Sequence, residues 1–367
     1  MLDKKKEIAI EEKKKWISLT GLCNNSCIFC LDGDRNDRYH RAKTEVEKDI
    51  EKGFKEGATR LVLSGGDPTI HPDITSFVRY GKKIGYKRTQ IITNGRMLAY
   101  KSFVNSLADA GLDEVTFSTH GHNAGLHDTL TSVKGSFKQV MRGVKNAQKA
   151  GFIVNSDTVV NKLNYKYLPE IISFLYSKGI NEVNLMSIVP FGRAWKNREI
   201  ILYEFEDIMP FVNKVIEYCK ENNITLWFSR FPAEYLENYP EYIESPKKIL
   251  EEVLARGEDF FRKRPLCYGE RCKYCGVKSV CSNLVNKEYD NAEPICLADN
   301  KAGIKNIIKL EKPFKEAAEK ICMNMRAKRL SCSKCIYAGS CSGILVEKAR
   351  KEGFSSLKPI TNNKAGM

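Results

Sequence analysis

The sequence predicts an α/β fold, a partial TIM-type (β/α)6 barrel followed by a small cysteine-rich domain. Short apolar segments alternate with helical segments from residue 16 to about residue 230. Glycines follow most of the helical segments, where they commonly end a helix. Nine of the 13 cysteines lie beyond residue 265. The first two features predict the barrel, and the third predicts a separate domain.

Each predicted strand is rich in Val, Ile, Leu or Phe, which is typical of strands buried on both faces. The predicted strands are Trp16–Thr20, Arg60–Ser64, Thr89–Thr93, Glu114–Thr119, Phe152–Val160 and Glu182–Pro190. The predicted helices are Lys43–Glu56, Pro72–Ile84, Ala99–Ala110, Ser136–Ala150 and Lys166–Lys178. This alternation indicates a parallel sheet with right-handed crossovers. A doubly wound open sheet is the alternative, but no Gly-x-Gly-x-x-Gly follows a strand, which disfavours dinucleotide binding.

Polar and glycine-rich segments follow the predicted strands, at the edge of a parallel barrel where functional groups lie. The segments are Cys23 to Cys30, Gly65-Gly66-Asp67-Pro68, Thr93-Asn94-Gly95, Ser118 to His122, Asn155-Ser156-Asp157 and Ser187 to Gly192. Their common placement predicts one functional site at this rim.

Three cysteines, Cys23, Cys27 and Cys30, stand within eight residues directly after the first strand. Thiolates are ligands for iron–sulfur clusters, zinc or Cu(I). A structural zinc site normally has four protein ligands, and no further cysteine or histidine occurs before His40. Three thiolates would leave one metal open to another ligand. Half of a zinc site is the alternative interpretation.

The N-terminal residues lack an apolar signal sequence, and no run of about 18 apolar residues occurs. We therefore expect a cytoplasmic protein without a transmembrane segment, in which clustered cysteines bind metals. The formal net charge is +15, and residues 301–367 hold 15 Lys and Arg against 5 Asp and Glu. This basic region suits an anionic partner, nucleic acid included, or it is a solvated lysine-rich surface.

Four regions are predicted from these patterns. Residues 1–230 form the barrel, 231–264 a helical bridge, 265–350 the cysteine-rich domain and 351–367 a flexible tail. The third region repeats one spacing, in Cys272-x2-Cys275-x5-Cys281 and Cys332-x2-Cys335-x5-Cys341. Because long apolar runs are few there, metal binding would supply much of its folding energy.

The motif Cys23-x3-Cys27-x2-Cys30, with Phe29 before its last cysteine and the Gly65-Gly66 turn after the second strand, resembles the radical S-adenosylmethionine (SAM) superfamily over residues 16–195. The resemblance implies a [4Fe–4S] cluster on the three cysteines, with SAM at the open iron. It also implies a reductant such as ferredoxin or flavodoxin. Reductive cleavage of SAM would give a 5′-deoxyadenosyl radical that abstracts a substrate hydrogen.

The resemblance also implies cofactor contacts. The turn Gly65, Gly66, Asp67 and Pro68 corresponds to the family's Gly-Gly-Glu turn at the methionine amino group, with Asp67 in place of glutamate. Contacts to the ribose and carboxylate of SAM fall to Ser118, Asn155 and Ser156, and adenine packing falls to Ile188, Val189 and Gly192. Candidates for proton transfer are His120, His122 and Asp157.

The paired cysteine motifs near the C-terminus resemble the SPASM or Twitch auxiliary-cluster domains, in a variant in which Val285 and Leu345 replace a fourth cysteine. The resemblance implies two auxiliary [4Fe–4S] clusters, which need eight thiolates. Structural zinc is the alternative. The candidate ligands are Cys267, Cys272, Cys275, Cys281, Cys296, Cys322, Cys332, Cys335 and Cys341, with Cys322 grouped with the last three.

Together these resemblances imply a radical SAM oxidoreductase or maturase, and the resemblance to auxiliary-cluster enzymes implies that it acts on a peptide. Modification of an RNA or of a small metabolite is the first alternative. A zinc-dependent nucleic-acid-binding module is the non-enzymatic alternative, and its binding would fall steeply with salt.

Overall fold

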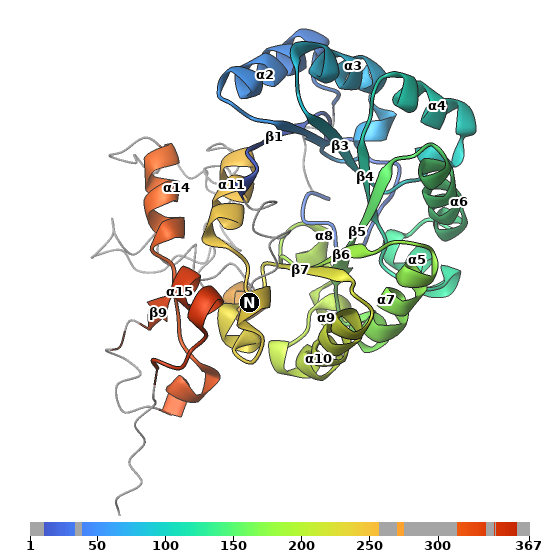
Figure 1. Ribbon diagram of the computed structural model, residues 1–367. Coiled ribbons are helices and arrows are strands. Elements are labelled where there is room, and N and C mark those ends of the chain that lie inside the picture. Colours follow the sequence, from blue (N-terminus) through green and yellow to red (C-terminus); the bar gives the residue numbers. More distant parts are fainter. Residues whose placement is uncertain are drawn as a thin grey trace, which may run out of the picture. The chain divides into compact units, whose positions relative to one another are not determined.

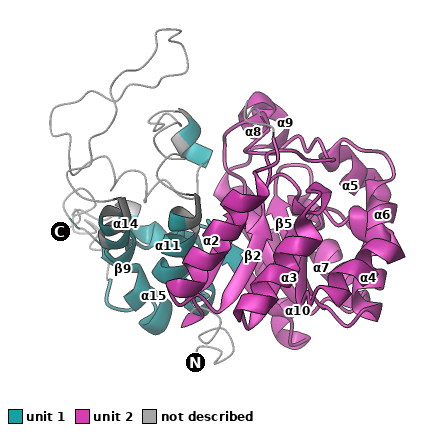
Figure 2. Cartoon of the chain, turned by 90° about the horizontal axis from the view of Figure 1, so that it is seen from above, with its two compact units in different colours: residues 1–10, 228–367 teal, residues 11–227 magenta. Residues whose placement is uncertain are grey.

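A computed structural model describes residues 11–33, 39–256, 270–274, 314–334, 341 and 343–357. The chain divides into two compact units (Figure 2). One unit comprises Glu11–Trp227, and the other comprises Phe228–Met367 together with Met1–Ile10. Within the described residues, no helix has both the length and the apolar composition needed to cross a membrane.

The first unit is built on a curled sheet of seven strands in the order of the sequence, β1 to β7, with helices along its outer side (Figure 1). The pairs from β1–β2 to β5–β6 are parallel, which confirms the partial barrel. The strands are β1 Lys14–Ser18, β2 Arg60–Ser64, β3 Arg88–Thr93, β4 Glu114–Ser118, β5 Ile153–Val160, β6 Glu182–Ser187 and β7 Thr225–Ser229. The seventh strand, a short segment after a long helix, is absent from the predicted six.

Helices connect these strands. They are α2 Lys43–Lys55, α3 Ile74–Ile84, α4 Lys101–Asp109, α5 Ala124–Thr131, α6 Ser136–Lys149, α7 Leu168–Ser177, α8 Arg193–Lys196, α9 Arg198–Ile201 and α10 Phe205–Glu221. All five predicted helices are present, with ends within two residues of the prediction. The sequence analysis missed α10. It also missed α5, α8 and α9, which are too short to give a helical pattern.

The two faces of the sheet differ in burial. Phe117 and Leu185 on the helix-facing side are fully buried. By contrast, Asn155, Asp157 and Asn184 on the inner side are partly exposed. The expectation of burial on both faces is therefore wrong for β5 and β6, because a sheet that does not close into a barrel leaves its inner side open.

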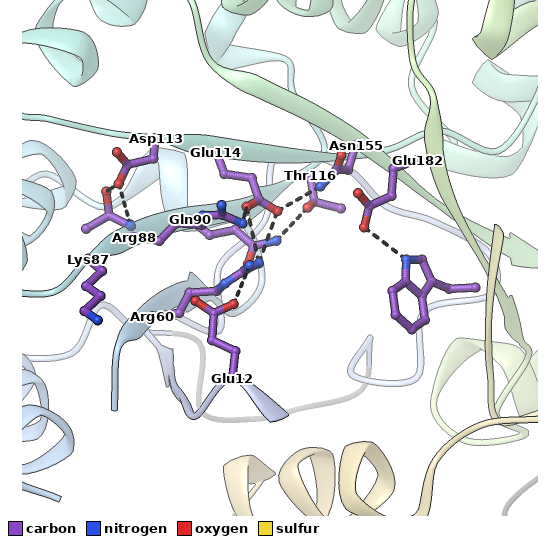
Figure 3. Close-up of polar contacts among 12 residues, drawn as sticks. Glu12, Arg60, Lys87, Arg88, Gln90, Asp113, Glu114, Thr116, Asn155 and Glu182 are labelled. Carbon is purple, nitrogen blue, oxygen red and sulfur yellow. Dashed lines mark hydrogen bonds and ion pairs between the residues drawn. The ribbon is translucent and has the colours of Figure 1, made fainter. Parts of the chain in front are cut away.

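A charged network fills the inner side of the sheet at the amino ends of the strands (Figure 3). Glu114, the first residue of β4, accepts from Arg60 Nη1 at 3.2 Å and from Arg88 Nη1 at 3.5 Å. Arg60 Nη2 also lies 2.6 Å from Glu12 Oε2, and Asn155 Nδ2 donates to Glu114 Oε1 at 2.8 Å. Burial raises the pKa of Glu114 despite the two guanidinium groups. This network occupies the end of the sheet opposite the cysteine loop.

The second unit contains short elements in its described part. They are η4 Ala233–Leu236, η5 Pro240–Tyr242, α11 Pro246–Arg256, η6 Glu270–Tyr274, α14 Phe314–Met323, β8 Arg326–Ala327, η7 Leu330–Lys334, β9 Ile344–Leu345 and α15 Val346–Glu352. The predicted bridge over 231–264 contains α11. The predicted tail begins too early, because α15 continues to Glu352 and Phe354 is buried. Residues 358–367 of that tail lie outside the described part.

Candidate functional site

The three cysteines of the first motif lie on one loop after β1, at the carboxyl end of the sheet. Burial raises the pKa of the Cys23 thiol to about 11, with a further contribution from the charge of Asp67. Burial also raises the pKa of Cys27, and the thiolates of Cys23 and Cys30 act on it in the same direction. The three thiols are therefore close enough to repel one another as thiolates. A bound cation would reverse this penalty, because the thiolate is the form that binds metal.

Backbone hydrogen bonds hold the cysteine loop against two neighbouring segments. In the turn after β2, the Gly66 N–H donates to Thr20 O at 2.7 Å and the Asp67 N–H donates to Leu22 O at 2.8 Å. At the end of α5, Ser26 N donates to the carbonyl oxygen of Thr131, and Ile28 N donates to that of Leu130, both at 3.0 Å. The loop thus takes its shape from other parts of the rim.

Gly65 and Gly66 are required by this contact between the loop and the turn. A Cβ on Gly66 would lie 2.0 Å from Leu22 O, and one on Gly65, whose φ is +134°, would lie 2.5 Å from Thr20 O. The sequence analysis assigned the glycine pair to an approach toward the cofactor. The structure shows a second reason for glycine at both positions, which is the close approach of the cysteine loop to this turn.

The Asp67 carboxylate is fully buried and fixes the end of β3 to the turn after β2. Oδ1 accepts from the Thr69 backbone N–H at 2.9 Å, and Oδ2 accepts from Thr93 Oγ1 and the Asn94 N–H, each at 2.8 Å. The Thr69 hydroxyl donates to it as well. Burial raises the pKa of Asp67, and these hydrogen bonds oppose that effect. The carboxylate is therefore occupied by hydrogen bonds from within the protein.

Asn94 and Arg96, after β3, contact the cysteine loop directly. Asn94 Nδ2 lies 3.7 Å from Cys23 Sγ and 2.5 Å from Asn24 Oδ1. Arg96 Nη1 donates to Asn25 Oδ1 at 3.1 Å and to the carbonyl oxygen of Asn24. The sequence analysis placed Asn94 at the rim without a role, and it missed Arg96, whose type and spacing match no motif.

His120 is buried between β5 and the cysteine loop. Its Nδ1 accepts from the Val159 N–H at 3.3 Å, and its ring packs edge-on against Phe29 with 4.6 Å between centroids. Burial lowers its pKa well below the usual range, and lowers that of its neighbour His127 to about 4. His120 is therefore neutral near pH 7 and supports Phe29 of the cysteine motif. His122 lies beside Asn123, with 2.9 Å between Nε2 and Nδ2.

The polar residues of β4 and β5 that were predicted to belong to the site lie in three different places. Ser118 is paired with Asp157 in the sheet, and both are partly exposed on its inner side. Asn155 lies on the same side but bonds to Glu114, at the opposite end of the sheet from the cysteines. Ser156 is buried on the helix-facing side, where it contacts the Thr119 hydroxyl. Ser118 and Asp157 are therefore the inward-facing residues of this group nearest the rim.

The loop after β6 completes the site. Ile188 is buried, Val189 is partly exposed, and Gly192 lies against the cysteine loop. Arg193 and Asn197 donate hydrogen bonds to carbonyl oxygens of that loop. The sequence analysis named the first three of these residues and missed the last two.

The C-terminal cysteines are described only in part. Cys322 is fully buried in an apolar cluster with Ala318 and the partly buried Ile249, Leu250 and Leu254, a setting typical of a packed thiol. Cys332 is buried and Cys341 is exposed. The backbone of Cys272 lies in η6, whereas Cys267, Cys275, Cys281, Cys296 and Cys335 fall outside the described residues. Cys219 is fully buried, as expected for a core thiol.

The described residues contain no group of three His, Cys, Asp or Glu side chains placed to hold a single metal ion. Among the three thiols of the cysteine loop, Cys23 Sγ has the backbone N–H of Asn25 at 3.4 Å and Asn94 Nδ2 at 3.7 Å. This donor set fits a cluster of several metal atoms, whose thiolates are hydrogen-bonded in proteins.

Comparisons with known proteins agree with this geometry. Residues 17–175 match the radical SAM superfamily. A probable GTP 3′,8-cyclase of Sulfurisphaera tokodaii is 30% identical over 277 residues, which are 75% of this chain and 82% of that protein. One from Saccharolobus solfataricus is 32% identical over 178 residues, 48% of this chain and 57% of that protein.

Solved structures of Streptococcus suis SuiB have a similar fold. The structure bound to SAM has a TM-score of 0.54 at 18% identity, over 93% of this chain and 74% of SuiB. The structure bound to the precursor peptide SuiA has a TM-score of 0.53 at 18% identity, over 95% of this chain and 75% of SuiB. At this identity the likeness concerns the fold alone.

Proposed function

Because this chain belongs to the radical SAM superfamily of enzymes, we propose that Cys23, Cys27 and Cys30 bind its [4Fe–4S] cluster and leave one iron for SAM. The observation that carries the proposal is the single loop of three mutually interacting thiols at the carboxyl rim of the sheet. Four other rim segments fix this loop, so the ligands are held before metal binds. Such preorganisation is expected of a cofactor site.

When bound, the cluster supplies the electron that cleaves SAM to methionine and a 5′-deoxyadenosyl radical. The protein's part is to orient SAM and to exclude water. We propose that the Gly65-Gly66 turn lies at the methionine end, that Ser118 contacts the polar part of SAM, and that Val189 packs against the adenine. Asp67 is left out of this set because its carboxylate is occupied within the turn.

For the substrate, we propose a purine nucleotide of the GTP class rather than the peptide that the sequence analysis placed first. The support is the relative from S. tokodaii, which is named for GTP and aligns over 75% of this chain, more than the barrel unit alone. The basic segment 301–367 also suits a triphosphate. A small metabolite was the alternative drawn from the sequence.

A peptide is the second candidate. The fold likeness to SuiB, which was solved with its precursor peptide, extends over 95% of this chain and thus into the second unit.

The paired cysteine motifs of the C-terminal region support auxiliary clusters. Leaving out the packed Cys322, eight C-terminal cysteines remain, enough for two [4Fe–4S] clusters.

Anaerobic reconstitution tests the proposal. Iron and sulfide are counted in the wild type and in the triple variant Cys23→Ala/Cys27→Ala/Cys30→Ala, and SAM cleavage to 5′-deoxyadenosine is followed with dithionite. The wild type should hold about four irons per chain more than the variant and should alone cleave SAM. Tightly bound zinc without SAM cleavage would contradict the enzyme.

The substrate is tested in the same assay. GTP, ATP and a mixture of short peptides are added separately, and the rate of 5′-deoxyadenosine formation is compared with that without substrate. GTP should increase the rate and yield a modified nucleotide by mass spectrometry. An increase with peptides alone would favour the second candidate, with the cluster chemistry unchanged.

A further inference from the structure

Arg193, at the start of α8, lies beside two of the three cysteines. Its backbone N–H donates to Cys30 O at 3.0 Å, and its Nε donates to Cys27 O at 2.9 Å. Its side chain also hydrogen-bonds to the Cys30 side chain, and its charge acts on both Cys27 and Cys30. A residue that follows the sixth strand therefore contacts both the backbone and a thiol of the loop that follows the first strand.

Two glycines make room for this contact. Gly192 has φ +57°, and a Cβ there would lie 2.4 Å from the carbonyl oxygen of Leu31. A Cβ on Gly33 would lie 2.6 Å from Arg193 Nε. Asn197, one helical turn further along, donates from Nδ2 to Ile28 O at 2.9 Å. The two loops therefore fit together closely around the arginine side chain.

The charge near the three thiols is uneven. Cys23 receives neutral donors, the Asn25 N–H at 3.4 Å and Asn94 Nδ2 at 3.7 Å. Burial raises the pKa of Cys27 and Cys30, and Arg193 opposes this effect at both. At Cys30 the backbone N–H of Asp32 also lowers the pKa, whereas the Asp32 carboxylate raises it. A positive charge and N–H···S hydrogen bonds stabilise the more negative, reduced state of a cluster, and they thereby raise its reduction potential.

We propose that Arg193 is a positioning residue that holds Cys27 and Cys30 in place for metal binding and raises the reduction potential of the cluster bound there. The inference rests on the proposed function, because it requires a cluster on these cysteines. Two properties of arginine contribute separately. The planar fork of donors holds the loop, and the positive charge sets the potential.

Three variants separate these contributions. Arg193→Met removes both the charge and the donors, whereas Arg193→Lys keeps the charge and loses the fork. Arg198→Met is the matched control, because this substitution removes an equal charge from the neighbouring helix. Arg198 stacks on the Trp195 ring, with 4.9 Å between its Cζ and the ring centroid. Each full-length protein is reconstituted anaerobically beside the triple cysteine variant. The readouts are the rate of iron loss to a chelator and the midpoint potential of the EPR signal that the triple variant lacks.

Arg193→Met should lose iron several-fold faster than the wild type and have a more negative midpoint potential. Arg193→Lys should lose iron faster but keep a potential near that of the wild type, and Arg198→Met should match the wild type in both. Wild-type values for Arg193→Met would overturn the inference, as would an equally large potential shift in Arg193→Lys. If Arg193→Met does not fold by circular dichroism, Arg193→Lys decides alone. Failure of the proposed function would instead appear as a wild type without the EPR signal.

Discussion

The carboxylate of Asp67 accepts a hydrogen bond of 2.8 Å from the backbone N–H of Asn94, and this bond joins the turn after β2 to the end of β3. The same Asn94 places its side-chain amide 3.7 Å from Cys23 Sγ. The residue at the position where the family commonly has glutamate thus acts on the cysteine loop through the backbone. The shorter aspartate side chain suits this role, because it turns back onto its own turn, where it accepts from the Thr69 N–H.

Asp67→Asn should destabilise the protein and weaken cluster binding. The amide would direct N–H groups at backbone donors inside a fully buried site, and each unsatisfied buried group costs about 1–3 kcal/mol. We expect a melting temperature lower by several degrees in thermal unfolding and a lower iron content after reconstitution. Asp73→Asn is the control, because the Asp73 side chain makes no capping hydrogen bond. Equal melting temperatures for the two variants would contradict this role.

Gly66→Ala should displace the cysteine loop. The new Cβ would lie 2.0 Å from the carbonyl oxygen of Leu22, and a backbone atom cannot move aside as a flexible side chain can. The φ angle of Gly66 is not positive, so the effect is steric and does not come from backbone strain. We expect the reconstituted variant to hold about four irons fewer than the wild type.

The matched control for Gly66→Ala is Gly125→Ala on α5, where the nearest atom to a new Cβ is Asn123 Oδ1 at 3.3 Å. This variant should keep its full iron content. Full iron content in Gly66→Ala would show that the loop and the turn can separate without loss of the site.

Much of the fold follows from local patterns, and much of the site does not. Arg60–Ser64 was predicted with its observed bounds, because an apolar run between a glycine-ended helix and a glycine turn gives clear limits. The strand β7 and the helix α10 were missed, because no element was predicted between the end of Glu182–Pro190 and residue 230. By contrast, the cysteine spacing led directly to the metal hypothesis.

The residues that hold the cysteine loop could not be read from the sequence. Arg96 and Arg193 act through contacts with residues 71 and 166 positions away in the chain, and no spacing rule connects such residues. Ser156 and Asn155 show a related limit. Adjacent residues on a strand face opposite sides of the sheet. Which of the two faces the inner side depends on the strand register, and the sequence does not fix that register.

Two of the buried histidines, His120 and His127, predict a pH dependence of stability. The pKa of His127 is lowered to about 4 in the folded protein, against about 6.5 in an unfolded chain. Between these values the unfolded chain binds a proton that the folded protein does not, so the free energy of unfolding falls as the pH decreases from 6.5 toward 4. The shift corresponds to about 3 kcal/mol at most.

His127→Asn should flatten this part of the stability curve in urea unfolding measured at a series of pH values. The Asn oxygen can still accept from the His120 N–H, which lies 3.2 Å from His127 Nδ1 in the wild type. A slope unchanged by His127→Asn would mean that this histidine titrates normally in the folded protein.

Arg60→Met tests the charged network at the amino end of the sheet. The substitution leaves Glu114, which is 2% exposed, with Arg88 as its remaining cationic neighbour at 3.5 Å. Breaking a buried pair costs about 3–5 kcal/mol. Lys82→Met is the control, because the Lys82–Asp113 pair is about one-third exposed and is worth less than about 1 kcal/mol. Similar unfolding free energies for the two variants would contradict a buried, coupled network.

The pH dependence of the Arg60→Met variant gives a second measurement of the same network. Burial already raises the pKa of Glu114, and loss of the Arg60 guanidinium should raise it further. A folded-state pKa above the unfolded one means that stability is lost as the pH rises through the folded-state value, so the deficit of Arg60→Met should be larger near pH 8 than near pH 5. Adding Glu114→Gln removes the ionisable group, and the double variant should lose this extra pH dependence while remaining less stable than the wild type.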